Sequence, residues 1–293
     1  MPNSSYVFAN QLRIHYLSWN HAGERAPIVL HHGLASNAHI WDLVAPFLAQ
    51  AGHPVFAIDA RGHGLTDKPD QGYDLPAVTD DLAAFSDSCR LQRPLLVGHS
   101  WGALAVLHYA ARFAIGPRAP AGVVLVDGGL SQMNDGQTTW EEVRRRLTPP
   151  SLAGMHLETF RRKLYKWNAD WDPSETAIQA YLAGFEVDDE ERITPRLTLE
   201  RHLAILRSMW DTPTHALYAR LRSPLLALAC RRASPPGSLE AGHFARQQLG
   251  IQLLQRARPD AQVQVLDDTI HDVPLQRPEL LARLVTDFAG RCG

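Results

Sequence analysis

The sequence predicts an α/β fold in which a mostly parallel sheet of eight strands has helices on both faces. Short apolar runs such as 122–126 alternate with longer segments of helical periodicity along most of the chain. Strands that are apolar on both sides are typical of such a sheet, because helices bury them from above and below. The alternation stops between about residues 130 and 218, where charged amphipathic segments broken by prolines predict a helical cap inserted after strand six.

Each expected strand is an apolar or alternating run that ends at a turn signal. The eight strands are expected, in order, at two runs within 6–19 and at 27–30, 54–58, 94–97, 121–126, 224–229 and 262–266. The helices are expected at 40–51, 75–89, 103–113, 239–256 and 278–289. The helix 75–89 is expected to turn Asp80 and Asp81 outward. We expect the core to comprise residues 1–130 and 219–293, and the cap residues 131–218.

Composition and charge argue against several classes of protein. The 293 residues contain 29 Lys and Arg and 31 Asp and Glu, a formal charge of −2, so no surface for nucleic acid or for an anionic membrane is expected. Three cysteines at unrelated spacings favour neither a disulfide framework nor a zinc site. There is no basic segment followed by an apolar stretch at the N-terminus, and no apolar run approaches ~18 residues. We therefore expect a cytoplasmic protein.

The stretch Gly98-His99-Ser100-Trp101-Gly102 lies between an expected strand and an expected helix. A serine between two glycines at such a corner is typical of a nucleophile elbow. The turn is so tight that the flanking positions must be small. It lifts the serine hydroxyl above the sheet, over the positive end of the following helix. This context predicts that Ser100 is a nucleophile.

A serine hydroxyl needs a base that takes its proton, and fourteen histidines are available. His271 follows the last expected strand and precedes the last expected helix. It should therefore lie at the same rim of the sheet as Ser100, at the place of the base in the order nucleophile, acid, base. We expect His271 to deprotonate Ser100.

Together these motifs resemble the α/β-hydrolase superfamily, in its lidded branch of esterases and lactonases. The resemblance covers nearly the whole chain and is carried by the elbow, by His32-Gly33, by Asp59-Ala60-Arg61-Gly62-His63-Gly64 and by His271-Asp272-Val273-Pro274. It implies an oxyanion hole made by the backbone N–H groups of Leu34 and Trp101. Gly33 lets this loop approach a substrate closely, and His32 braces the loop. Both are also candidate substrate contacts.

The position of the acidic residue of the triad departs from the commonest pattern of the superfamily. Most relatives carry an aspartate shortly after strand seven, but residues 230–238 contain no carboxylate. Asp127 ends strand six and is followed by two glycines. This position supplies the acid in parts of the superfamily, haloalkane dehalogenases among them. We expect Asp127 to be the acid, and Glu240 stays open as the alternative, although a carboxylate at a helix start also suits the helix dipole.

The resemblance implies a serine hydrolase that cleaves a carboxylic ester or a lactone through an acyl-enzyme, with neither a cofactor nor a metal ion. The expected cap is rich in aromatic residues, and Trp140 and Trp167 are candidate contacts with a small apolar substrate. Two alternatives stay open. One is a C–C bond hydrolase of the same fold, and the other is a small-ligand sensor that retains the triad without turnover. No oligomeric state is predicted.

Overall fold

The computed structural model describes residues 2–234 and 239–292, and of Leu239 and Glu240 the backbone alone. Eight strands in this part of the chain form one sheet in the order β1-β2-β4-β3-β5-β6-β10-β11. Their bounds are β1 (Asn3–Ala9), β2 (Leu12–Trp19), β3 (Ile28–His31), β4 (Val55–Ile58), β5 (Leu95–His99), β6 (Gly122–Val126), β10 (Leu225–Arg231) and β11 (Gln262–Asp267). β2 is antiparallel to both neighbours, and the other pairs are parallel. The prediction of a mostly parallel, eight-stranded sheet is confirmed.

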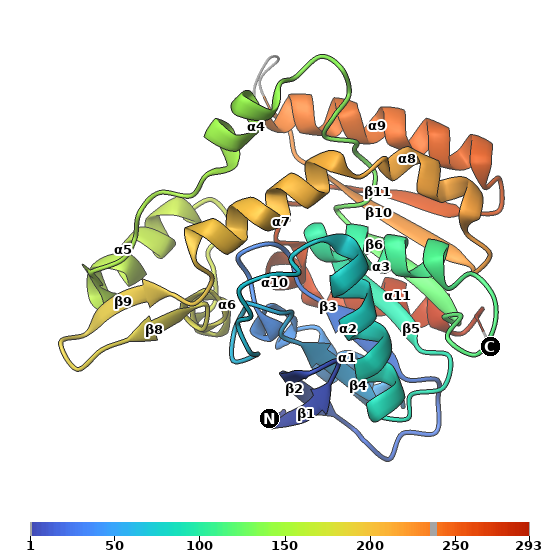
Figure 1. Cartoon of the computed structure of the whole chain (residues 1–293), viewed down its shortest axis with the longest axis horizontal. Helices are drawn as coiled ribbons and strands as arrows, with labels where there is room; N and C mark the ends of the chain where they lie inside the picture. Colours follow the sequence, from blue (N-terminus) through green and yellow to red (C-terminus); the bar gives the residue numbers. More distant parts are fainter. Residues whose placement is uncertain (1, 235–238, 293) are drawn as a thin grey trace.

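Helices cover both faces of this sheet (Figure 1). They are α1 (Ala45–Gln50), α2 (Leu75–Ser88), α3 (Trp101–Arg112), α9 (Leu239–Ala257) and α11 (Pro278–Ala289). α1 and α11 pack against alternate strand residues such as Leu30 and Val97, whereas α2, α3 and α9 pack against the intervening ones, such as Val29 and Leu96. The central strands are apolar throughout because both of their faces are buried. None of the described helices is both long and apolar enough to span a membrane.

The helix expected at 40–51 is interrupted. A short 3-10 helix, η1 (Ala38–Trp41), comes first, and α1 then begins at Ala45 with Pro46 in its first turn. Proline has no N–H to donate to the preceding turn, so it starts a helix more readily than it continues one. Asn37 caps η1, because its side-chain oxygen accepts a hydrogen bond of 2.9 Å from the His39 N–H.

The segment between β6 and β10 extends away from the sheet (Figure 1), and we call residues 131–218 the cap. It contains α4 (Trp140–Leu147), α5 (Leu157–Trp167), α6 (Glu175–Leu182), α7 (Leu199–Asp211) and α8 (Thr214–Leu217), and η2 (Tyr218–Arg220) lies at its end. A division of the chain into separate core and cap units stays a prediction.

The expectation that this segment holds no strand is wrong. Within the described residues of the cap, β7 (Met155–His156), β8 (Phe185–Val187) and β9 (Arg192–Pro195) form a second, small sheet. Strands of two to four residues are too short to produce a recognisable alternation of apolar and polar residues. The turn between β8 and β9 is held by Asp188, whose carboxylate accepts from the N–H groups of Glu190 and Arg192.

The cap is attached to the core at both of its sides. On one side, the Asn37 side chain donates a hydrogen bond of 2.9 Å to the Ala180 carbonyl at the end of α6. The next residue along α6, Tyr181, donates from its hydroxyl to a carboxylate oxygen of Asp272 at 2.6 Å. On the other side, the Ser208 hydroxyl of α7 accepts from the Leu75 N–H at the start of α2. α6 is thus bonded to two loops at the carboxyl edge of the sheet.

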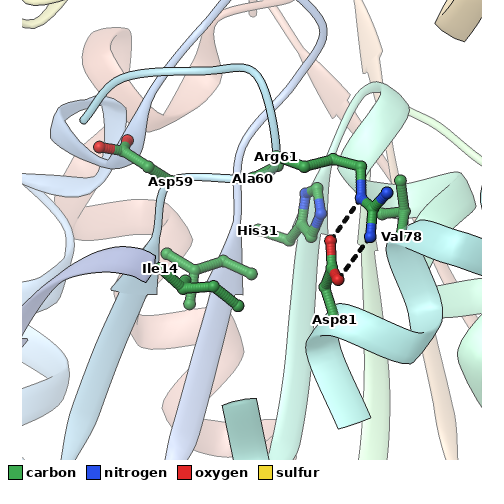
Figure 2. A pocket seen from close by; sticks show the side chains of 8 residues that line it. Ile14, His31, Asp59, Ala60, Arg61, Val78 and Asp81 are labelled. Atoms are coloured by element: carbon green, nitrogen blue, oxygen red, sulfur yellow. Dashed lines mark hydrogen bonds and ion pairs between the residues drawn. The ribbon is translucent and has the colours of Figure 1, made fainter. Parts of the chain in front are cut away.

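Asp81 is buried, which corrects the expectation that it faces outward on α2. Its carboxylate binds the Arg61 guanidinium through two hydrogen bonds of 2.5 and 2.6 Å, and it also accepts from the Asn10 side chain. Figure 2 shows this pair beside a cavity of about 10 Å³ that Ile14, His31 and Ala60 also line. A cavity of this size holds at most about one water molecule, so it is no substrate site. The buried guanidinium requires an anion and therefore directs Asp81 inward.

Candidate active site

Ser100 stands at the corner between β5 and α3 in a strained backbone conformation, with φ 56° and ψ −118°. The glycines on either side allow this corner. A Cβ on Gly98 would lie 2.1 Å from the Gly102 carbonyl oxygen, and a Cβ on Gly102 would lie 2.4 Å from the His31 carbonyl oxygen. The elements around the serine are therefore closer together than any side chain at these positions would permit.

The side chains of Ser100, His271 and Asp127 form one continuous hydrogen-bonded chain. His271 Nε2 is 2.9 Å from Ser100 Oγ, and His271 Nδ1 is 2.6 Å from Asp127 Oδ2. A carboxylate can only accept, so Nδ1 carries the hydrogen in the neutral imidazole, and Nε2 is left to accept from the serine hydroxyl. The three residues are far apart in sequence, but each follows the carboxyl end of a strand of the main sheet, namely β5, β6 and β11.

Asp127 is buried, and its carboxylate accepts hydrogen bonds from three groups. Besides His271, the Cys230 N–H and the Gln247 side-chain amide each donate to Oδ1 at 2.8 Å. Burial acts to raise the pKa of Asp127, but the bonds from His271, Gln247 and the Cys230 N–H outweigh it and lower the pKa to about 2. The carboxylate is therefore negatively charged at neutral pH.

The charge of Asp127 also acts on His271. Burial tends to lower the pKa of this imidazole, but the hydrogen bond and the charge of Asp127, followed by the charge of Asp272, raise it from 6.5 to about 9. The imidazolium form of His271 is thus stabilised where it lies, between Ser100 and Asp127. In its neutral form this imidazole is a stronger base than a free one, and in that form it can take the proton of the serine.

The loop after β3 lies directly against Ser100. A Cβ on Gly33 would lie 3.0 Å from the Ser100 Cβ and 3.5 Å from its Oγ, so only glycine fits here without displacing a neighbour. The backbone N–H of the next residue, Leu34, and that of Trp101 have no protein acceptor in the part of the chain that the structure describes. An oxyanion hole requires two such N–H groups close to the serine hydroxyl, and the assignment of both groups stays a prediction.

Two buried histidines hold this loop. His32 Nδ1 donates to the Gly33 carbonyl at 2.7 Å, and its Nε2 accepts from the Ala60 N–H at 3.0 Å. His63 Nε2 accepts from the Ala35 N–H at 3.3 Å, and its ring stacks on the indole of Trp101 with 5.3 Å between centroids. Burial lowers the pKa of His32 to about 4 and that of His63 to about 3, so both rings stay neutral and keep their acceptor nitrogens.

Further contacts hold the loop that carries His271. The buried ring of His99 donates from Nε2 to the His271 carbonyl at 2.8 Å. The Asp272 carboxylate accepts a hydrogen bond from the Tyr181 hydroxyl of the cap, as described above. It makes no hydrogen bond to the imidazole of the neighbouring His271. His63 and His99 belong to the motifs quoted above, but no role in the site is predicted from the sequence for them, for Cys230 or for Gln247. These roles depend on contacts with residues far away along the chain, which no local pattern encodes.

Not every predicted site residue lies at the triad. Contacts with a substrate stay a prediction for His32, Gly33, Trp140 and Trp167. The ring of Trp140 packs near Trp210 within the cap, with centroids 6.2 Å apart. Trp167 is 54% exposed and packs beside Phe160 at the end of α5. The side chain of Glu240, the alternative acid, lies outside what the structure describes.

The chain as a whole matches a known protein family. The model of the alpha/beta hydrolase family matches residues 28–284, which is most of the chain. The chain belongs to the alpha/beta hydrolase family. This alpha/beta hydrolase has a fold shared with the crystal structure of E-2-(acetamidomethylene)succinate hydrolase, with a TM-score of 0.77 and 21% sequence identity over 99% of this chain and 100% of that one.

Curated relatives fall into two groups by the length of the match. The non-heme chloroperoxidase of Streptomyces lividans is 36% identical, but over 111 residues that span 38% of this chain and only 40% of that protein. The 2-(acetamidomethylene)succinate hydrolase of Mesorhizobium japonicum is 27% identical over 88% of this chain and 85% of that protein. The N-formylmaleamate deformylase of Pseudomonas putida is 27% identical over 92% of this chain and 89% of that protein.

Proposed function

We propose that this alpha/beta hydrolase is a serine hydrolase that cleaves a carboxylic ester or a lactone through a covalent acyl-enzyme. The observation that supports this most is the unbroken chain of hydrogen bonds from Ser100 Oγ through the His271 ring to the Asp127 carboxylate. This arrangement has the donors and acceptors that activation of a serine hydroxyl requires.

In the first half of the reaction, Ser100 Oγ attacks the carbonyl carbon of the substrate while His271 Nε2 takes the hydroxyl proton. The carbonyl oxygen becomes an oxyanion, which the N–H groups of Leu34 and Trp101 stabilise by hydrogen bonds. The tetrahedral intermediate collapses, the bond to the leaving group breaks, and His271 gives its proton to the departing oxygen. In a lactone, this oxygen stays attached to the acyl group.

In the second half, water attacks the acyl-enzyme and His271 takes one of its protons. The second tetrahedral intermediate collapses to the free acid, and the proton returns to Ser100. Asp127 stays ionised throughout. Its charge and its hydrogen bond keep Nδ1 protonated and stabilise the imidazolium that forms in both halves, which fits its low pKa.

The substrate we propose is small and apolar. The cap carries most of the tryptophans of the chain, and an aromatic lining on the cap would favour binding of an apolar acyl or alcohol group. All the catalytic groups in this scheme are side chains and backbone N–H groups of the chain itself.

Hydrolysis of an N-acyl bond is a second candidate. Two of the curated relatives, both matched over most of their length, are named as a hydrolase of 2-(acetamidomethylene)succinate and a deformylase of N-formylmaleamate. The same triad can transfer an acyl group from nitrogen, provided that His271 protonates the departing nitrogen. The C–C hydrolase and the sensor are kept as outcomes of the test below.

The test combines labelling with turnover. Fluorophosphonate should label Ser100 of the wild type and fail to label Ser100→Ala. A panel of short aryl esters, lactones, N-acyl amides and dienone-type diketones then identifies the bond that is cleaved. We expect multiple turnovers of an ester or lactone by the wild type and none by Ser100→Ala. Turnover by Ser100→Ala would end the serine mechanism, and labelling without turnover of any class would favour the sensor.

A further inference from the structure

His243, on α9, lies beside the triad without taking part in its hydrogen bonds. Its Nε2 is 3.9 Å from Asp127 Oδ2, and its ring meets the His271 ring edge-on with 6.1 Å between centroids. One ring nitrogen of each histidine and one carboxylate oxygen of Asp127 lie within 4.8 Å of one another. Among the described residues, no other group of three histidine, cysteine or acidic side chains converges in this way.

The Nε2 atom of His243 makes no hydrogen bond in the described part of the chain and could serve as a ligand to a metal ion. It is shielded from solvent and has no hydrogen-bond partner among the described residues, although the side chain as a whole is 42% exposed. The His271 side chain is 49% exposed. The three ligand atoms therefore lie just beneath the surface, bordered by two imidazole side chains that are partly exposed.

We propose that Asp127, His243 and His271 form a site for Zn²⁺ or a similar divalent transition-metal ion, and that the bound ion inhibits the enzyme. Imidazole nitrogen and carboxylate oxygen are ligands that Zn²⁺ prefers, and three protein ligands leave a fourth position for water. Bond lengths of about 2.0–2.1 Å place tetrahedral ligand atoms roughly 3.3 Å apart. The distances of 2.6 and 3.9 Å from Asp127 Oδ2 lie on either side of that value.

Inhibition follows from the proton on His271, and this step rests on the proposed function. The ion takes the lone pair of Nδ1, so the hydrogen bond from Nδ1 to Asp127 breaks. In a neutral ring the Nδ1 proton moves to Nε2, and in an imidazolium the Nδ1 proton leaves to water. In both cases Nε2 then carries a hydrogen and has no lone pair for the Ser100 proton. Metal binding and turnover are therefore mutually exclusive.

Metal binding is tested first without turnover, in Ser100→Ala. Equilibrium dialysis should find one Zn²⁺ per chain, and Co²⁺ should develop the visible absorption of a tetrahedral site. We expect His243→Phe in the same background to weaken binding by at least about tenfold. His156→Phe is the matched control, because His156 is also half exposed and lies 3.2 Å from a carboxylate, that of Glu191. Its affinity should be unchanged.

Inhibition is tested with the wild-type serine. Zn²⁺ should inhibit turnover reversibly, a chelator should restore it, and His243→Phe should need at least about tenfold more Zn²⁺ for half inhibition. His243→Gln and a melting curve guard against a folding defect. The metal site is rejected if Ser100→Ala binds no Zn²⁺ saturably, or if His243→Phe and His243→Gln bind as well as their parent. Because binding is measured in Ser100→Ala, this result does not depend on whether the chain hydrolyses any substrate.

Discussion

Asp127 has a backbone φ of 47°, in the left-handed region that aspartate tolerates and most residues avoid. Its place was predictable, because a carboxylate at the end of a strand next to that of Ser100 lies at the same edge of the sheet as the serine. Its supporting partners were not predictable. Gln247 and Cys230 reach Asp127 across more than one hundred residues of chain, and no local pattern encodes such a contact.

Asp127→Asn should lower kcat/KM by roughly four orders of magnitude, because a neutral amide can neither stabilise the imidazolium nor enforce the tautomer of His271. Hydrolysis needs the unprotonated imidazole, so kcat/KM of the wild type rises as the pH passes the raised pKa of His271. Without the charge of Asp127 that pKa falls, and the rise should move to lower pH. A pH–rate profile measures both effects.

Glu240→Gln is the control for this assignment. We expect its pH–rate profile and its kcat/KM to match the wild type. A large loss of rate in Glu240→Gln together with a small loss in Asp127→Asn would make Glu240 the acid and Asp127 a structural residue.

His63→Phe should lower kcat while leaving KM nearly unchanged, because a phenyl ring can stack on Trp101 but cannot accept from the Ala35 N–H next to the proposed oxyanion donor. Loss of one oxyanion donor costs about 100-fold or more in other hydrolases, so a displaced donor should cost a substantial part of that. His63→Gln keeps an acceptor near the position of Nε2 and should recover most of the rate. Equal losses in the two variants would contradict this role.

At the scale of the elements, the order and type of the main strands and helices were predictable from periodicity, and the structure confirms them. The errors have local physical causes. Pro46 divides one predicted helix, and the strands of the cap are too short to show a period. The outward position expected for Asp81 is wrong because its partner Arg61 is buried, and that burial is invisible from the sequence.

Tyr181→Phe should loosen α6, because it removes the hydrogen bond from the cap to Asp272, next to His271. We expect faster amide hydrogen exchange in residues 175–182 and unchanged exchange in α3, with a loss of stability of about 1 kcal/mol. Tyr73→Phe is the control, since its hydroxyl donates to the Pro69 carbonyl and not to any residue of α6. The proposed attachment fails if exchange in α6 is the same in both variants.

At the scale of the whole molecule, the Arg61–Asp81 pair joins α2 to the loop after β4. The Asn10 side chain, in the turn between β1 and β2, also donates a hydrogen bond to Asp81 and so connects this turn to α2. Asp81→Ala leaves a buried guanidinium without its counter-ion and should lower the free energy of unfolding by about 3–5 kcal/mol. The neighbouring Asp80→Ala removes an exposed pair with Arg112 and should cost at most about 1 kcal/mol. Urea denaturation of the two variants checks this contrast, and similar losses would refute it.

The free energy of unfolding should decrease as the pH is lowered below neutral. Burial lowers the pKa of His31, His32 and His99 from 6.5 to about 4, and that of His63 to about 3. Between about pH 4 and 6.5 the unfolded chain therefore binds more protons than the folded one, and the free energy of unfolding decreases with falling pH. The slope is on the order of 1.4 kcal/mol per pH unit for each histidine. His271 has a raised pKa, so it acts oppositely and only above pH 6.5.

Urea midpoints measured at about pH 7 and about pH 5 test this dependence. His63→Gln, which cannot titrate, should have a shallower dependence than the wild type. Equal midpoints at the two pH values would show that the four imidazoles are not held neutral by the fold.

β6 and β10 are direct neighbours in the sheet, with Leu125 paired to Ala227, although almost one hundred residues separate them in sequence. The two ends of the cap also meet each other: the His215 ring lies 3.3 Å from the Leu130 carbonyl oxygen, and the Tyr218 hydroxyl donates a hydrogen bond of 2.9 Å to the Gly129 carbonyl. A segment with such closely spaced ends can be lengthened, shortened or exchanged without altering the register of any strand. The sheet edge that holds Ser100, Asp127 and His271 thus stays fixed when the cap changes. Evolution or an engineer can therefore change the preferred substrate by replacing the cap alone.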